Sequence, residues 1–286
     1  MSRYSFSGHE SFQCKSLWLK KGYDFLLNGD RFSKTDSVAI LGVGKNMVSS
    51  IRFWLRAFGL TKQDELLAIA KFLFDSETGR DQYVQDINTL WLLHFLIVSA
   101  KEASLYNLLF VEYKREKREF TKTELQNFIK RKCSVPEQKN VYNENTVRKD
   151  IGVLLKNYVS PSDLKSIEDF SSILLELNLI QKGAKGKDNE VYYVFREVSS
   201  SEISPEVILF ALYYIANGDK TISFDKLMEL SLTFCTPIVS LIQLIQSAEK
   251  KYPGLIAYAD NSGVKNVQFL HNFAPFSILE KYYEQQ

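Results

Sequence analysis

The sequence predicts a mainly helical α+β protein in which tandem winged-helix or helix-turn-helix modules carry small β wings. Helix-forming segments recur in three blocks of similar length along the 286 residues, and each block runs toward a strand-like or hairpin-like stretch. The first block also has a glycine turn between two helical segments. We therefore expect three domains: residues 1–100 with a helix-turn-helix, residues 101–200 as a second winged-helix-like domain, and residues 201–286 as a helical, winged-helix-like domain with a hairpin.

The first block is bounded by two helical segments. Residues 16–28 (SLWLKKGYDFLLN) predict its opening helix, and residues 87–99 (INTLWLLHFLIVS) predict an apolar closing helix. Between them, Thr35, Asp36 and Ser37 offer helix N-caps before residues 39–48, AILGVGKNMV. This stretch fits a helix, a tight turn and a second helix.

The second and third blocks repeat the order of helices followed by strands. Thr121 and Glu124 form a capping box between helices expected over residues 105–116 and 125–132, and a further helix over 143–159 precedes a strand at 190–197. In the third block Ser204 caps a helix that begins with Pro205. Its remaining predicted elements are helices over residues 224–231 and 237–252 and a hairpin over 255–270 with the turn Asn261-Ser262-Gly263.

The composition is that of a soluble globular protein, with 45% hydrophobic and 24% charged residues. No apolar run approaches the roughly 20 residues that a membrane helix needs, and the first residues lack the apolar core of a signal peptide. Cys14, Cys133 and Cys235 are odd in number and far apart, which argues against a disulfide framework. We therefore expect a cytoplasmic protein without a membrane partner.

The stretch AILGVGKNMV also suggests a P-loop, because Gly44 and Lys45 end such a motif. A P-loop needs another glycine, separated by four residues from the Gly-Lys pair, and a Ser or Thr hydroxyl after the lysine as a Mg²⁺ ligand. Here Ala39 and Asn46 occupy those two positions, and no buried strand is expected before them. The sequence therefore favours the helix-turn-helix interpretation, with Leu41, Gly42 and Val43 at the turn.

The helix after this turn has two different faces. Helical spacing places Met47, Ile51, Trp54 and Phe58 on an inner face and Lys45, Ser49, Arg52 and Arg56 on the opposite face. Residues 37–63 contain four lysines and arginines and no acidic residue, although the whole chain carries only +2. Such an unopposed basic face is what a helix lying along DNA phosphates and base edges requires. The predicted DNA contacts are Lys45, Asn46 and Ser49 to base edges and Arg56 and Lys62 to phosphates, with Arg52 on the same face.

The second block offers a weaker basic surface. Its predicted DNA contacts are Arg148 and Lys149, whose charge Asp150 dilutes, and Lys185 in a possible wing. Further positive charge comes from residues 130–132, Lys156, Lys182 and Lys187. The third block has no basic stripe, which favours a scaffold or partner surface there.

No catalytic centre is predicted, so we expect a protein that is not an enzyme and has no cofactor. The sequence contains no GxSxG, HExxH or CxxC motif. His9, Glu10 and Cys14 could be considered as metal ligands. Zinc needs three or four ligands, usually as close pairs, so the sequence favours a structural or capping role for the histidine. Cys133 follows three basic residues, which favours a lowered pKa of its thiol, yet it lacks a partner base.

Three stretches resemble the bacterial domain of unknown function family 4007. They are FSGHESFQCKSLWLKKGYDFL (6–26), LGVGKNMVSSIRFWLRAFGL (41–60) and TLWLLHFLI (89–97), and the resemblance covers most of the chain. His9 matches the family's Gly-His-Glu element, whereas Cys14-Lys15 stands where the family has a Cys-Arg pair. Members tend to be encoded beside genes of DNA phosphorothioation and related phage-defence systems. The resemblance therefore implies a role in DNA modification or defence, with other subunits of such a system as partners. It does not imply an enzyme activity for this chain.

The residues thus predict a protein that binds double-stranded DNA, and the resemblance implies a non-catalytic subunit or recruiter of a defence system. Three alternatives remain open. The chain could repress its own operon through the same DNA-binding chemistry, dock proteins without touching DNA, or use Lys45 as a nucleotide-dependent enzyme.

Overall fold

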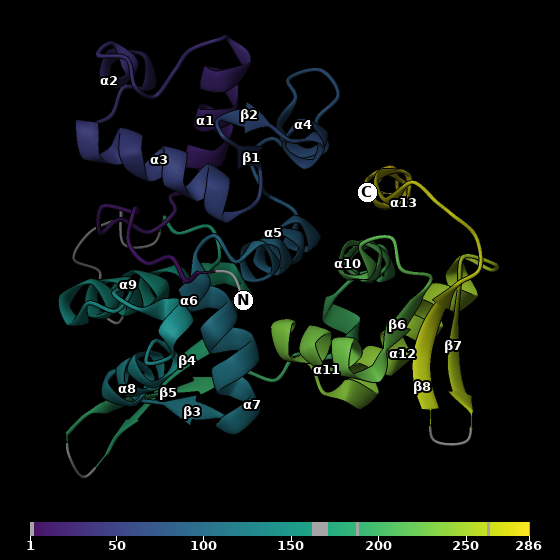
Figure 1. Cartoon of the computed structure of the whole chain (residues 1–286). Coiled ribbons are helices and arrows are strands. Elements are labelled where there is room, and N and C mark those ends of the chain that lie inside the picture. Colours follow the sequence, from purple (N-terminus) through teal and green to yellow (C-terminus); the bar gives the residue numbers. More distant parts are fainter. Residues whose placement is uncertain (1–2, 162–170, 187–188, 262–263, 286) are drawn as a thin grey trace. The chain divides into compact units, whose positions relative to one another are not determined.

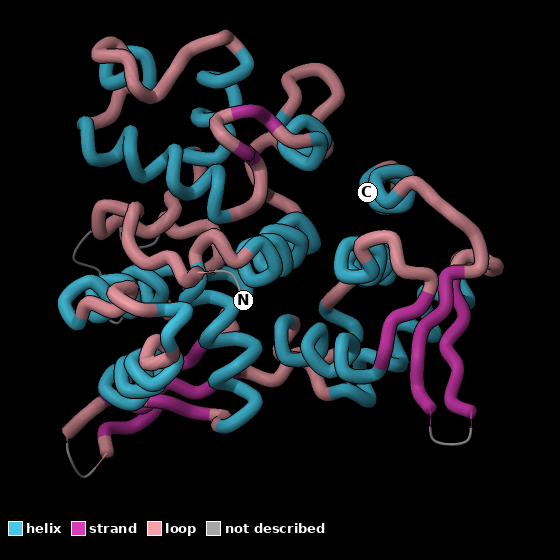
Figure 2. Tube along the Cα trace, in the orientation of Figure 1, coloured by secondary structure: helices cyan, strands magenta, loops and turns pink. Residues whose placement is uncertain are grey.

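The computed structural model describes residues 3–161, 171–186, 189–261 and 264–285. It divides into two compact units, unit 1 (Met1–Arg196) and unit 2 (Glu197–Gln286). Most of the secondary structure is helical, and the strands form small antiparallel sheets (Figure 1, Figure 2). The predicted mainly helical α+β class is therefore confirmed, while the division into three domains stays a prediction.

The first half of unit 1 is a cluster of helices with one short hairpin. Its elements are α1 (Trp18–Leu27), α2 (Ser37–Leu41), α3 (Lys45–Ala57), β1 (Thr61–Lys62), β2 (Glu65–Leu66), α4 (Ala68–Phe74) and α5 (Ile87–Ala100). Gly22 lets α1 pack closely on α3, because a Cβ atom there would lie 2.6 Å from Leu55 Cδ1 and 2.8 Å from Ile51 Cγ2. Residues 88–98 of α5 are all buried, which explains why its sequence is apolar on every side.

The second half of unit 1 runs helix, strand, helix, helix, hairpin. Its elements are α6 (Ser104–Asn107), the π-helical η1 (Leu108–Tyr113), α7 (Lys114–Glu116), β3 (Glu119–Phe120), α8 (Lys122–Lys132), η2 (Pro136–Gln138), α9 (Glu144–Tyr158), η4 (Leu175–Leu177), β4 (Ile180–Lys185) and β5 (Val191–Phe195). The antiparallel sheet has the order β3-β5-β4. Thr121 and Glu124 form the predicted capping box at the start of α8.

Unit 2 has the same order of elements. They are η5 (Ser200–Glu202), α10 (Pro205–Ala216), β6 (Thr221–Ser223), α11 (Phe224–Thr233), α12 (Ile238–Lys251), β7 (Ile256–Asn261), β8 (Val264–Phe269) and α13 (Pro275–Tyr283). Its antiparallel sheet has the order β6-β8-β7, so the last strand is again central. Ser204 caps α10 ahead of Pro205, as predicted. Ser262 and Gly263 of the predicted hairpin turn lie outside the described residues, but β7 and β8 pair on both sides of them.

The sequence missed several elements. The short strands β1, β2, β3 and β6 have at most three residues, too few to show an alternating pattern. Helices α4 and α13 were also not predicted; α13 follows the hairpin that was expected to close the third block. Both missing helices are short, with seven and nine residues. The identity of the modules as winged helices stays a prediction.

Within the described residues, no helix by itself combines the length and apolar character of a membrane span. Helices α11 and α12 reach both criteria only when taken together, and they are bent by 103° where they meet.

Candidate nucleic-acid interface

Two glycines shape the turn between α2 and α3. Gly42 ends α2 with φ 63°, in the left-handed region that favours glycine. Gly44 is extended, and its carbonyl oxygen accepts hydrogen bonds from the backbone N–H groups of Met47 (2.9 Å) and Val48 (3.1 Å), which starts α3. Gly44 therefore lies between two helices and Lys45 begins the second of them, whereas a P-loop follows a β-strand.

We expect no useful affinity for ATP–Mg²⁺. Asn46 stands where a P-loop has its Mg²⁺-binding hydroxyl, and the preceding element is the helix α2. Isothermal titration calorimetry with ATP and MgCl₂ checks this expectation, with Lys71→Ala as a control for loss of one exposed lysine. A micromolar complex that disappears in Lys45→Ala but not in Lys71→Ala would contradict it.

The inner face of α3 is formed by large side chains, as predicted. Ile51, Trp54 and Phe58 are fully buried, and Met47 is half-buried. Phe53, which was not assigned to this face, is also buried, and its ring lies edge-on to His9 at 5.6 Å between ring centroids. The helix is therefore fixed in rotation by packing on more than one side.

The predicted outer face of α3 is exposed. This exposed strip, here called the α3 strip, consists of Lys45, Asn46, Ser49, Arg52 and Arg56. Lys62 is exposed on β1, the strand that follows the helix. Among the described residues, Lys45 and Lys62 have no ion-pair partner. The structure thus brings five of the predicted DNA contacts onto one helix face, with a sixth on the neighbouring hairpin.

Acidic residues do reach the α3 strip, contrary to the expectation from residues 37–63. Arg52 Nη2 lies 2.8 Å from Asp64 Oδ2, and Arg52 Nε donates to Asp64 Oδ1 at 2.8 Å. Arg56 Nε lies 3.4 Å from Glu102 Oε2. Asp64 is one residue past the acid-free stretch, and the tight β1–β2 turn brings it back to the helix. All four side chains are at least one-third exposed, so each pair contributes only about 0–1 kcal/mol to stability.

A hollow of about 200 Å³ adjoins the α3 strip. It is lined by the polar and basic residues Ser49, Arg52 and Arg56 and by Gly8, Phe32, Val48 and Phe53. The Arg56 guanidinium lies 6.0 Å from the centroid of the Phe53 ring, so part of this side chain rests on an aromatic surface. Two guanidinium groups and a hydroxyl around one hollow are donors that suit a phosphate group.

The second predicted basic surface lies on α9. Arg148 and Lys149 are exposed, and Arg148 Nη2 donates to Asn145 Oδ1 at 3.0 Å. Asp150 does not dilute their charge as expected, because it is buried and bonded to His9. The exposed part of this helix is therefore more basic than its sequence indicates.

The third group of predicted contacts is set apart from α3. Lys182 and Lys185 are exposed on β4, whereas Lys187 lies outside the described residues. Figure 1 shows α9 between α3 and the β4–β5 hairpin within unit 1. The structure therefore does not bring Lys185 into the surface formed by the α3 strip.

The basic residues before Cys133 are mostly engaged. Arg131 pairs with Glu116 at 2.7 Å and Lys132 with Glu112 at 2.5 Å. Burial raises the pKa of the Cys133 thiol, so the expectation of a lowered pKa is wrong. Positive charge in the sequence did not lower this pKa because the lysine and arginine heads turn to carboxylates while the thiol is buried.

His9 connects α3 to α9. Ser11 N–H donates to His9 Nδ1 at 3.1 Å, which leaves the ring proton on Nε2 to donate to Asp150 Oδ1 at 2.9 Å. Asp150 Oδ2 accepts from Ser7 N–H at 2.8 Å, and the His9 carbonyl oxygen accepts from Ser50 Oγ at 2.9 Å. The histidine of the Gly-His-Glu element therefore has a structural position, as the sequence favoured, and it fixes the α3 helix through Ser50.

Loss of Asp150 is expected to destabilise unit 1. Asp150→Ala leaves the His9 and Ser7 N–H groups without this acceptor in a buried place, which costs roughly 2–5 kcal/mol of unfolding free energy. Asp150→Asn keeps one acceptor oxygen and should lose less. Urea unfolding followed by tryptophan fluorescence measures this for unit 1, since Trp18, Trp54 and Trp91 all lie there.

The exposed neighbour Lys149→Ala is the matched control and should stay within about 0.5 kcal/mol of the wild type. If Asp150→Ala unfolds at the same urea concentration as Lys149→Ala, the buried pair does not hold α3 to α9.

A second polar network surrounds Cys14. Asn157 Oδ1 accepts from Cys14 N–H at 3.1 Å and from Ser172 Oγ at 2.8 Å, while Asn157 Nδ2 donates to Tyr106 Oη at 2.7 Å. Cys14 is free and fully buried, and this burial raises the pKa of its thiol. Cys14 is therefore part of the core. In the part of the chain that the structure describes, no group of three or more His, Cys, Asp and Glu side chains is placed to hold a metal ion.

The fold is that of a mainly helical α+β protein with small antiparallel sheets, and its helix α3 has an exposed basic surface. The model of the family described as protein of unknown function DUF4007 matches residues 6–283, and the chain belongs to this family. Two solved structures have a similar fold. They are an SspB crystal structure (TM-score 0.79) and a magnesium ion-bound SspB crystal structure (TM-score 0.78), each 24% identical and covering 98% of this chain and 88% of that chain. No curated protein matches the chain.

Proposed function

We propose that this protein binds double-stranded DNA through the α3 strip, with its hairpins as the wings of winged-helix modules. The observation that carries the proposal is the orientation of α3 about its own axis. Its large side chains are buried, so its lysine, arginines and small polar residues face outward as one strip. Lys62 on the β1–β2 hairpin extends this positive surface. The arrangement supports phosphate contacts along the helix and base contacts near its start.

The shared order of elements supports the winged-helix assignment. The second half of unit 1 and unit 2 both run helix, strand, helix, helix, hairpin, and the last strand is central in both sheets. In winged helices the second of two paired helices enters the major groove. In this protein α3, which follows α2, and α9, which follows α8, hold that position. Arg148 and Lys149 on α9 then form a second, smaller contact surface.

We further propose that the protein acts in the cytoplasm as a non-catalytic subunit or recruiter of a DNA-modification or phage-defence system. The family resemblance implies this setting, and three buried cysteines that form no disulfide are in keeping with a reducing compartment. In that role the protein holds DNA for partner subunits rather than reading one operator.

Fluorescence anisotropy of a labelled 20-base-pair duplex tests the proposal on the full chain. We expect saturable binding to unrelated duplex sequences that weakens steeply with salt. Titrations are repeated with magnesium and with EDTA, because one of the similar SspB structures is described as magnesium ion-bound. A single tight palindromic site would favour the operon repressor, and no binding at any salt concentration would overturn the proposal.

Protein docking is the second candidate function, and α2 favours it. Val38 and Ile40 on this helix are 38% and 51% exposed, although apolar residues before a helix-turn-helix turn are expected to be buried. They precede the α3 strip by a few residues. Purification of the tagged protein with its neighbours, repeated with Val38→Ser/Ile40→Ser, decides whether this apolar pair holds a partner.

A further inference from the structure

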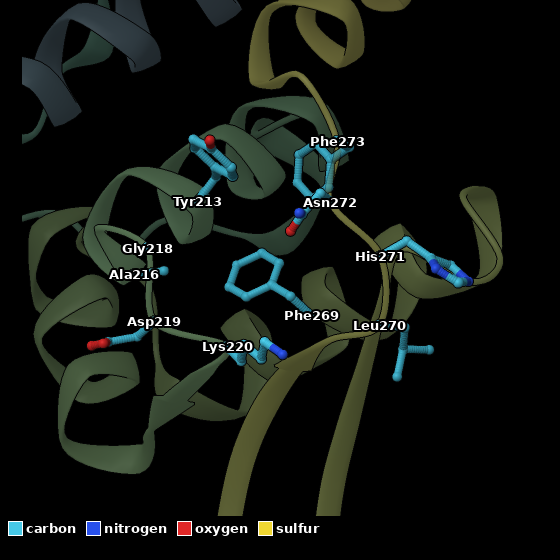
Figure 3. A pocket seen from close by; sticks show the side chains of 10 residues that line it. All are labelled: Tyr213, Ala216, Gly218, Asp219, Lys220, Phe269, Leu270, His271, Asn272 and Phe273. Atoms are coloured by element: carbon cyan, nitrogen blue, oxygen red, sulfur yellow. The ribbon is translucent and has the colours of Figure 1, made fainter.

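Unit 2 contains a hollow of about 330 Å³ lined by aromatic and polar side chains (Figure 3). It lies where α10 ends, where β8 ends and where the chain continues toward α13. Gly218, with φ 92°, turns the chain between α10 and β6 at its rim. None of these residues belongs to the α3 strip.

Three aromatic rings form the apolar part of this hollow. Ring centroids are 5.4 Å apart for Tyr213 and Phe273, 6.0 Å for Phe269 and Phe273, and 6.4 Å for Tyr213 and Phe269. Tyr213 is 42% exposed, and both phenylalanines are half-buried. The rings contact one another in tilted or edge-on arrangements, and each keeps part of its surface exposed, where a planar aromatic ligand can stack.

Three polar side chains of the hollow lack partners among the described residues. Lys220 Nζ has no ion pair, and the Asn272 amide and the Tyr213 hydroxyl have no hydrogen bond there. In Figure 3 the Asn272 amide lies between the rings of Phe269 and Phe273, and Lys220 lies beside Phe269. Asp219 points away from the rings in the same view, and its carboxylate pairs with Lys226 at 3.2 Å. The unpaired charge of the hollow is therefore positive.

We infer that this hollow binds a single nucleotide unit, with the base stacked against the exposed surface of the three-ring cluster and the phosphate on Lys220. A cavity near 300 Å³ is at the lower end of the range for small-ligand sites, which suits one nucleotide. Every base has a π-face that stacks on aromatic side chains, and an amide and a hydroxyl can meet its polar edge. A lysine supplies the point charge that a phosphate needs. The inference does not rest on duplex binding by the α3 strip.

The nucleotide can come from a free mononucleotide or from single-stranded DNA, and two probes distinguish these sources. One is 2-aminopurine deoxyribonucleoside monophosphate, and the other is a single-stranded hexamer of thymidine with one internal 2-aminopurine. Stacking quenches 2-aminopurine fluorescence, so quenching reports on the base itself. Equal affinity for both probes assigns free nucleotide, and much tighter binding of the hexamer assigns single-stranded DNA.

Five variants of the full chain test the inference. Tyr213→Ala and Lys220→Ala should each weaken binding at least about fivefold, as loss of one stacking or phosphate contact does. Tyr214→Ala, equally exposed at 42% but outside the hollow, and Lys250→Ala, an exposed lysine elsewhere in unit 2, should bind like the wild type. The Lys45/Ser49/Arg52/Arg56 alanine variant should also keep the quenching, which separates this inference from the proposed function. Absence of quenching with both probes, or quenching that Tyr213→Ala leaves unchanged, overturns it.

Discussion

Trp54→Ala is expected to lower the unfolding free energy of unit 1 by roughly 3–5 kcal/mol, the range for truncation of a large core side chain. Trp54 is fully buried, and its ring lies against those of Phe53 at 5.0 Å, Phe58 at 6.0 Å and Tyr106 at 6.3 Å. Its Nε1 donates to the Phe12 carbonyl oxygen at 3.2 Å. Alanine removes this hydrogen bond and leaves a cavity between α3, α6 and the N-terminal segment.

Urea unfolding followed by the fluorescence of Trp18 and Trp91 measures this change, because both remain in unit 1 and both are buried. Trp54→Phe keeps part of the ring packing and should lose less. Tyr83→Ala, at a side chain that is 56% exposed, is the surface control and should stay within about 0.5 kcal/mol. Should Trp54→Ala unfold like Tyr83→Ala, α3 is not held by this face, and the outward position of the α3 strip loses its basis.

The Lys45/Ser49/Arg52/Arg56 alanine variant is expected to lose most duplex binding while it stays folded. All four side chains are exposed, so their removal leaves the core intact. Each contacted phosphate contributes a slope of about −0.9 to the plot of log affinity against log salt concentration. Arg56→Ala should therefore weaken binding to all duplexes similarly and flatten this slope by roughly one unit. Anisotropy titrations at three salt concentrations measure both effects.

Two further variants separate base contacts from charge. Lys45→Ala and Asn46→Ala should change the preference for sequence or DNA modification more than they change the slope, because the start of the helix reaches base edges. Asp64→Asn should strengthen duplex binding, since it frees the Arg52 guanidinium from a carboxylate at 2.8 Å. The matched control for the quadruple variant is Lys71→Ala/Lys122→Ala/Lys250→Ala. It also removes three positive charges, but from exposed positions elsewhere on the chain.

If the quadruple variant folds normally and binds DNA like this control, α3 is not the DNA-reading element. Arg148→Ala/Lys149→Ala then tests the exposed face of α9 as the alternative contact. Should that variant also bind normally, protein docking through Val38 and Ile40 takes precedence.

The sequence predicted the elements whose signals are local. The Thr121–Glu124 capping box and the Ser204-Pro205 start of α10 were identified because a cap needs only the residues within one helical turn. The two faces of α3 followed from 3.6-residue periodicity, and Ile51, Trp54 and Phe58 are buried accordingly. The long β7–β8 hairpin was readable, whereas strands of two or three residues were not.

The aromatic hollow of unit 2 left no signal in the sequence. Tyr213 is separated from Phe269 and Phe273 by more than fifty residues, and only the antiparallel sheet brings the end of α10 next to the end of β8. A site assembled from such distant segments has no fixed spacing that a motif could capture.

By itself, the sequence determined that this protein is mainly helical and that α3 has an apolar and a basic side, whereas the structural position of His9 came from the folded chain. Only the tertiary structure decided which charges stay unpaired. Asp64 folds back onto Arg52, Glu102 reaches Arg56, and Asp150 is withdrawn from the surface of α9 by His9. The physical reason is that the rotation of a helix depends on neighbours within one or two turns, whereas the net charge of a surface depends on every side chain that the folded chain brings within a few ångströms of it.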